Sequence, residues 1–520
     1  MTFHHFSNNQ FMPLVISSVI LIASIMFFNF GRIRTSLVLL FLGTAGLGFF
    51  IANLDHFLIL WDEQYHALVA KNLSVNPFKP TLYSNPIIDY NYTDWTGNHV
   101  WLHKQPLFLW QIALSLKLFG YNALAVRLPS IILHAIAVLL IYRIGKISAN
   151  ERTGFYGALF FAVAYYPLEL IAGRYSTDHN DISFLFYVTA SFWAWFEYQN
   201  SKKLYFLVLT GLFSGCAVLV KWLVGLLIYP IWFFTLGVND KRNWFRIKSY
   251  KPIVISLLIT IIIFLPWQLY ILFNFPIEAN YEFAFNTRHF FEPLENHGGN
   301  VWFHFQAIKH LYGSGGAVPY ILLIGLFLYI RSMSSNIYRL TIISAIIIIY
   351  AFYSVAATKM ISFCIIVSPF VFLGLGSLID FITVYLSSKV KYPKFQYIIR
   401  LLFLILICFF LLNPSKIQKN HTDWKPKDNS KRLTEMREME FIDKLTAILG
   451  NENYVVFNVK TSLNGHIPVM FFTDYIAYEF IPTEEQIADI QSKNYKIAVV
   501  DSGNLPDYIK SKKEIIKIKM

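Results

Sequence analysis

Long runs of apolar residues, separated by short polar stretches, recur between residues 12 and 412. A helix needs about 20 mostly apolar residues to cross the hydrocarbon core of a bilayer. The pattern therefore predicts about twelve transmembrane helices, over residues 12–30, 35–53, 126–142, 153–172, 182–198, 204–219, 222–236, 252–272, 317–330, 338–355, 361–382 and 397–412. A shorter apolar run at 107–119 is expected to form a helix at the membrane interface.

Basic residues concentrate in every second connection between these runs. They are Arg32/Arg34, Arg143/Lys146/Arg152, Lys202/Lys203, Lys241/Arg242/Arg246/Lys248, Arg331/Arg339 and Lys389/Lys391/Lys394. The positive-inside rule assigns these connections to the cytoplasm. The other connections then face outward, namely residues 54–125, 173–181, the turn at Lys221, 274–316 and 356–359.

Beyond residue 412 the chain becomes polar and charged. Its pattern predicts helices over 430–449 and around 483–492, and short strands over 454–459, 467–472 and 497–501. The expected fold class is therefore an all-α polytopic membrane protein with a small C-terminal α/β domain. Residues 1–412 would form the membrane domain and residues 413–520 the domain on the outer side.

Composition agrees with this class, because 56% of the 520 residues are hydrophobic and only 14% are charged. A soluble protein of this size would carry roughly 25% charged residues. The net charge of +13 lies mainly in the cytoplasmic loops, so no nucleic-acid partner is expected. Cys216, Cys364 and Cys408 lie inside apolar runs, which disfavours disulfides or a cysteine metal site. No basic segment precedes the first run and no small-residue cleavage pattern follows it, so we expect a retained span.

The ionisable residues close to the spans lie on the outer side. They are Asp62, Glu63, His103, Lys104, Asp178, Asp181, Lys221, Arg288, His289 and Lys359. Ionisable side chains at membrane depth are costly and are candidates for function. A carboxylate can act as a general base on a hydroxyl, and several lysines or arginines can hold a leaving phosphate. This combination at a membrane surface indicates a lipid-phosphate donor. The sequence shows no glycine-rich phosphate loop after a strand, which disfavours a nucleotide-sugar donor.

These features resemble the GT-C superfamily of integral membrane glycosyltransferases. Within it, the chain is most similar to the group of dolichyl-phosphate-mannose-protein mannosyltransferases and aminoarabinose (lipid A) transferases. The resemblance rests on motifs that occur in order over residues 35–380: Trp-Asp-Glu-Gln-Tyr at 61–65, His-Lys-Gln-Pro-Leu at 103–107, Phe-Gly at 119–120, Ala-Val-Arg-Leu-Pro-Ser at 125–130, Gly-Arg-Tyr at 173–175 leading to Asp178, Val-Lys at 220–221, Pro-Trp at 266–267 and Thr-Lys at 358–359. It implies a GT-C type fold and sugar transfer from a polyprenyl-phosphate carrier to a lipid, glycan or protein acceptor.

The resemblance also implies roles for individual residues. Asp62 would be the catalytic carboxylate and Asp178 a second acidic site residue. The donor phosphate would be held by Lys104, Arg288, Lys221 and Lys359. Beside these, Glu63, Tyr65 and His103 are our candidates for binding the substrate. His103 stands where some relatives carry an acidic residue, and a bound divalent metal ion is left open.

Each assignment has an alternative. Asp62 and Asp178 could cap helices, where aspartate is favoured, and the lysines could simply extend to the membrane interface. The acceptor is not encoded in a motif, so a protein O-mannosyltransferase is one reading. A transporter or flippase is another, although such proteins usually carry charges near the bilayer midplane and an internal repeat. The short, basic cytoplasmic loops fit a bacterial inner (plasma) membrane with a periplasmic active site, and an endoplasmic-reticulum enzyme would have the same topology.

Overall fold

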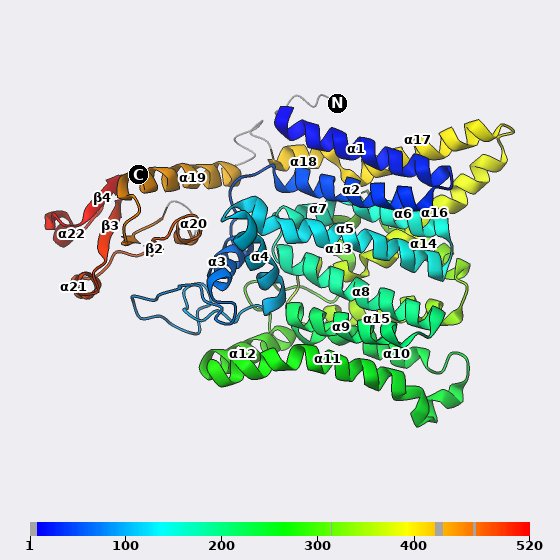
Figure 1. The fold of residues 1–520 in the computed structure, drawn as a ribbon, viewed down its shortest axis with the longest axis horizontal. Coiled ribbons are helices and arrows are strands. Elements are labelled where there is room, and N and C mark those ends of the chain that lie inside the picture. The colour runs from blue at the N-terminus through cyan, green and yellow to red at the C-terminus, as the bar shows by residue number, and fades with distance from the viewer. Residues whose placement is uncertain (1–7, 314, 422–429, 461–463, 520) are drawn as a thin grey trace.

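The protein is a bundle of long helices with a small domain attached at one end (Figure 1). The computed structural model describes residues 8–313, 315–421, 430–460 and 464–519. The chain begins with α1 (Asn8–Asn29), α2 (Ile33–Ala52), α3 (Asp62–Val75), α4 (Pro106–Phe119), α5 (Ala123–Ser148), α6 (Glu151–Ala162), α7 (Tyr165–Ile171) and α8 (Asp178–Ser201). It continues with α9 (Leu204–Lys221), the 3-10 helix η1 (Trp222–Leu227), α10 (Ile228–Thr235), η2 (Lys241–Phe245), α11 (Ile247–Asn274) and α12 (Pro276–Phe291). The bundle is completed by α13 (Phe303–Tyr312), α14 (Val318–Ser332), α15 (Asn336–Val355), η3 (Ile361–Val367), α16 (Ser368–Ser388), α17 (Pro393–Leu412) and α18 (Pro414–His421).

Eight of the described helices are long and apolar enough to cross a membrane, or nine if the bent pair α6–α7 is one span. The sequence predicted about twelve. Two expected spans fall outside this count: α8, which includes Asp178, Asp181 and Glu197, and α14, which has 15 residues. The apolar stretch Leu204–Thr235 counts once, yet it folds back at its centre. Ser214 Oγ, on α9, donates to the carbonyl oxygen of Gly225, on η1, at 2.8 Å. Eleven residues of continuous helix would separate these groups by about 16 Å.

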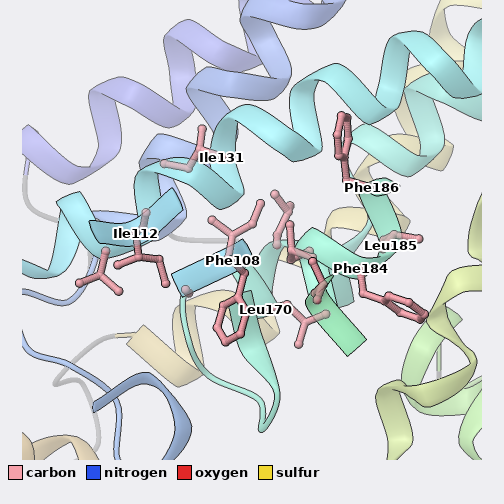
Figure 2. Packing of buried hydrophobic residues seen from close by; sticks show 14 of the residues in the cluster. Phe108, Ile112, Ile131, Leu170, Phe184, Leu185 and Phe186 are labelled. Atoms are coloured by element: carbon pink, nitrogen blue, oxygen red, sulfur yellow. The ribbon is translucent and has the colours of Figure 1, made fainter. Parts of the chain in front are cut away.

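The helices at the end of the bundle that carries α3 and α4 are fixed by a shared apolar core. Phe108 of α4, Ile131 of α5, Leu170 of α7 and Phe184 of α8 all belong to one buried cluster (Figure 2). The predicted interfacial helix at 107–119 is therefore a helix, α4, with one face packed into the core of the bundle. This packing holds the connections that follow α2 and α7 in place above the bundle.

The C-terminal domain contains a four-stranded, all-parallel sheet in the order β2-β1-β3-β4. Its elements are α19 (Ser430–Leu449), β1 (Tyr454–Phe457), α20 (His466–Phe472), β2 (Ile476–Ala477), α21 (Glu484–Ser492), β3 (Lys496–Asp501), α22 (Asp507–Ser511) and β4 (Ile516–Lys519). The predicted helix over 430–449 is confirmed, and so are the strands near 454 and 497. The strand predicted over 467–472 is wrong, because these residues form the buried helix α20. A short apolar run is compatible with either a buried strand or a buried helix.

The C-terminal domain contacts the first outer connection directly. Lys71 Nζ, on α3, donates to the carbonyl oxygens of Met470 at 3.0 Å and Thr473 at 2.6 Å. The Tyr83 hydroxyl donates to the carbonyl oxygen of Ala477 at 3.2 Å, and the Tyr83 ring stacks on Tyr478. Consequently α3 lies between the membrane bundle and the C-terminal sheet (Figure 1).

Candidate active site

Asp62 is the first residue of α3, directly after Trp61, whose φ is 77°. Its carboxylate does not cap α3. Asp62 Oδ2 instead accepts a hydrogen bond of 2.8 Å from the backbone N–H of Thr177, in the connection between α7 and α8. Thr177 itself has a φ of 71°, which is uncommon for a β-branched residue. The two outer connections that the sequence singled out therefore meet at this carboxylate.

The surroundings of Asp62 keep its carboxyl ionised. Burial raises its pKa, but the positive charges of Lys104 and His66 and the Thr177 N–H outweigh this and lower the pKa below its usual value. An ionised carboxylate is the form that can accept a proton from a hydroxyl.

Glu63 is enclosed by a network of hydrogen bonds. Arg127 Nε and Nη2 donate to its two carboxylate oxygens at 2.7 and 2.9 Å, and His179 Nε2 lies 3.2 Å from Oε1. Burial raises the pKa of Glu63, but Arg127 and His179 together lower it to about 2. The remaining donor groups of Arg127 bind the carbonyl oxygens of Ala52, Asp55 and Phe57. Glu63 thus fixes the connection that leads to Asp62.

Asp178 contacts a histidine that the sequence did not single out. Asp178 Oδ1 lies 3.0 Å from His66 Nδ1, and both side chains are fully buried. His66 is four residues after Asp62 on α3, a spacing that places both on one face of the helix. The spacing of four residues from Asp62 is the sequence signal that could have identified His66 as a site residue. Asp178 therefore orients His66, which in turn supports the negative charge of Asp62.

A cavity of about 210 Å³ has Thr177, the hydrogen-bond donor to Asp62, in its wall, although Asp62 itself is not one of the lining residues. Two of the predicted phosphate ligands line the cavity, Lys104 and Lys221, together with His103 and His289. Lys221, at the turn between α9 and η1, donates to Asp181 and lies 4.6 Å from the centre of the Phe363 ring. The cavity wall therefore holds two lysines and several aromatic rings together with one acidic residue, Glu295. The two lysines suit an anionic ligand.

His103 connects this cavity with two acidic residues. Its ring stacks on Trp95, its Nδ1 lies 3.6 Å from Glu282 Oε2, and its Nε2 lies 3.9 Å from Glu295 Oε1. Burial raises the pKa of Glu282 to about 7. Within the described ranges, no group of three His, Cys, Asp or Glu side chains is arranged to hold a metal ion.

Two of the predicted phosphate ligands, Arg288 and Lys359, do not line the cavity. Arg288 is exposed on α12 and donates to Glu292 at 2.8 Å. Successive helical residues point about 100° apart, so Arg288 faces outward where its neighbour His289 faces the cavity. Lys359 Nζ donates to the last carbonyl oxygens of α15, those of Tyr353 at 2.9 Å and Ser354 at 2.7 Å.

Tyr65 is also outside the cavity. It is buried, with its ring against Trp95 and its hydroxyl 3.5 Å from the carbonyl oxygen of Thr96. Of the predicted phosphate ligands, the structure thus brings Lys104 and Lys221 to one cavity and leaves Arg288 and Lys359 outside it.

Comparison with solved structures identifies the architecture. Over 88% of this chain and 88% of the other, the protein superimposes on ArnT from Cupriavidus metallidurans bound to undecaprenyl phosphate, with a TM-score of 0.64 and 13% identity. The chain has the ArnT fold. The archaeal oligosaccharyltransferase AglB from Archaeoglobus fulgidus is also similar, with a TM-score of 0.53 and 12% identity, over 89% of this chain and 69% of that chain.

Sequence comparisons agree with the ArnT fold over part of the chain. Residues 103–270 match the family model of dolichyl-phosphate-mannose-protein mannosyltransferase. An undecaprenyl phosphate-alpha-4-amino-4-deoxy-L-arabinose arabinosyl transferase from Pseudomonas paraeruginosa is 29% identical over 192 residues, which cover 34% of this chain and 32% of that enzyme. An uncharacterized protein from Aquifex aeolicus is 25% identical over 201 residues, 38% of this chain and 37% of that protein. The chain thus spans about a third of the length of these curated relatives, and its resemblance to this group of glycosyltransferases is confirmed.

Proposed function

We propose that the protein is a membrane glycosyltransferase that takes a sugar from a polyprenyl-phosphate carrier. The observation that carries this proposal is the pairing of an ionised carboxylate, Asp62, with a cavity that Lys104 and Lys221 line. The first can serve as a general base and the others can neutralise a leaving phosphate. The similarity to ArnT and to the mannosyltransferase family model supports the same chemistry.

The reaction follows from the positions of these groups. Asp62 takes the proton of the acceptor hydroxyl as its oxygen forms a bond to the anomeric carbon of the sugar. The bond from that carbon to the phosphate oxygen breaks, and its electron pair stays on the lipid phosphate. Lys104 and Lys221 then offset the added negative charge. Attack opposite the leaving group inverts the anomeric centre.

The remaining features of the function follow from the topology. We place the site on the outer face of the membrane, which in a bacterium is the periplasmic face of the inner membrane, because the basic connections lie at the other end of the bundle. In this topology α8 and α14 also cross the membrane. The acceptor is a lipid, a glycan or a protein, and the C-terminal domain borders the region from which it approaches.

Sugar transfer by the purified protein in liposomes tests the proposal. Radiolabelled polyprenyl-phosphate sugars are offered with lipid, glycan and peptide acceptors to the wild type, Asp62→Asn and Asp89→Asn. Asp89 is an exposed aspartate in the same outer connection and serves as the matched control.

We expect Asp62→Asn to lose at least about 100-fold in transfer rate and Asp89→Asn to match the wild type. Asparagine keeps an oxygen that can accept the Thr177 N–H, so the variant should remain folded. Equal transfer by Asp62→Asn would remove Asp62 from its role. Wild type that transfers no sugar to any acceptor in the panel would overturn the transferase assignment itself.

A further inference from the structure

A second cavity, of about 510 Å³, lies where α7 begins, α13 ends and α17 meets α18. These helix ends lie in the half of the bundle that carries α3 and α4 (Figure 1), so the cavity is near the outer surface. Its wall includes three basic residues, Lys309, His310 and Lys416, beside the aromatic residues Tyr165 and Tyr312. None of the described residues that line it is acidic.

The basic side chains at this cavity are close enough for their charges to affect His310. Partial burial and the charges of Lys309 and Lys416 lower the pKa of His310. Lys416 Nζ lies 4.3 Å from the centre of the Tyr165 ring and 3.4 Å from the Tyr175 hydroxyl. Burial lowers the pKa of Lys416, which the charge of Glu169 partly offsets. The two lysines carry like charges, and an anion that enters between them relieves their repulsion. The electrostatics of the cavity therefore favour an anionic group.

Part of the cavity wall is apolar and belongs to α17, which the proposed topology places in the membrane. It contains Leu411 and Phe410, and the Phe410 side chain is 68% exposed. Helix α17 lies at the edge of the bundle (Figure 1), and only 6% of its apolar stretch is buried. A ligand in this cavity can thus place a charged group between the lysines and an apolar chain along α17.

We propose that this cavity binds the phosphate head group of an anionic membrane lipid, whose acyl chain lies against α17. Free phosphate shares the charge but not the apolar part, so the exposed end of α17 favours the lipid. The site is separate from the candidate active site. The turn at 173–177 lies between them, because Tyr175 contacts Lys416 on one side and Thr177 binds Asp62 on the other. The proposal does not depend on the transferase activity.

Direct lipid binding to the full-length protein in a mild detergent tests this site. The probes are a fluorescent short-chain phosphatidylglycerol, the zwitterionic phosphatidylcholine of the same chain length, and inorganic phosphate as a competitor. The variants are Lys309→Gln, the double variant Lys309→Gln/Lys416→Gln, and Lys117→Gln as the matched control. Lys117 is an exposed lysine on α4, away from the cavity.

We expect phosphatidylglycerol to bind more tightly than phosphatidylcholine. Each lysine near a lipid phosphate contributes on the order of fivefold in affinity, so the double variant should bind phosphatidylglycerol roughly thirtyfold more weakly. Lys309→Gln changes an exposed side chain, so this single variant still tests the site if the double variant fails to fold. Unchanged affinity in the lysine variants, or equal binding of both lipids, would overturn the site. Competition by millimolar phosphate as strong as by unlabelled phosphatidylglycerol would overturn the assignment to a lipid.

Discussion

Replacing Arg127 by methionine should destabilise the protein by removing the buried partner of Glu63. The Glu63 pKa falls from 4.5 to about 2 in the folded protein. Each pKa unit corresponds to about 1.4 kcal/mol, so the groups around Glu63 stabilise its charged form by on the order of 3 kcal/mol at neutral pH. Removing one partner of a buried ion pair costs a similar amount, about 3–5 kcal/mol. Arg127→Met should therefore lower the free energy of unfolding by at least about 3 kcal/mol.

The pH dependence of this effect has a definite sign. Because the folded state lowers the pKa of Glu63, its stabilising contribution is complete above pH 4.5 and is lost as the pH falls toward 2. Without Arg127, burial dominates and favours the neutral carboxyl. The Arg127→Met variant should therefore gain stability, relative to the wild type, as the pH is lowered from 6 to 4.

Denaturant-driven unfolding in a mild detergent measures both effects. Arg143→Met is the matched control, because Arg143 also pairs with a glutamate, Glu197, but its side chain is 39% exposed. A pair of this kind contributes about 0–1 kcal/mol. The double variant Arg127→Met/Glu63→Gln should recover part of the loss, since it leaves no unpaired carboxylate. A loss of stability in Arg127→Met no larger than in Arg143→Met would contradict this role of Arg127. A double variant less stable than Arg127→Met alone would contradict it as well.

Three further predictions concern the cavity and the turn beside it. Lys221→Met should lower the rate of sugar transfer at least about tenfold by removing a charge near the leaving phosphate. Arg288→Gln should leave the transfer rate within about twofold of the wild type. Equal effects of the two substitutions would contradict the assignment of Lys221, but not Arg288, to the cavity. Burial raises the pKa of Glu282 to about 7, so the wild type should become more stable as the pH falls from 8 to 6, and Glu282→Gln should flatten this dependence in thermal unfolding. Gly173→Ala should destabilise the protein by about 1–3 kcal/mol, because Gly173 has a φ of 73° and an added Cβ would lie 2.4 Å from Glu63 Cδ; a melting temperature equal to that of the wild type would refute this contact.

The sequence was most informative where one local pattern determines one structure. The lengths of the apolar runs predicted most of the helix bundle, and the sequence motifs placed Asp62 and Lys104 in the same predicted outer region. Local patterns could not choose between a strand and a buried helix over 467–472, since both bury a short apolar run. They also could not show that His289, rather than its neighbour Arg288, faces the cavity, because the rotation of α12 depends on contacts with distant segments.

The position of α3 between the bundle and the C-terminal sheet affects how the protein is assembled during synthesis. Asp62 is synthesised early, but the groups that hold its helix are made much later. Lys71 bonds to a carbonyl 399 positions further along the chain, and Arg432 bonds to Asp55 across 377 positions. Because chains are synthesised from the N-terminus and their domains generally fold as units, α3 cannot reach its final packing until the C-terminal domain has been made and has folded. A chain interrupted before that domain would therefore carry Asp62 on an incompletely supported helix.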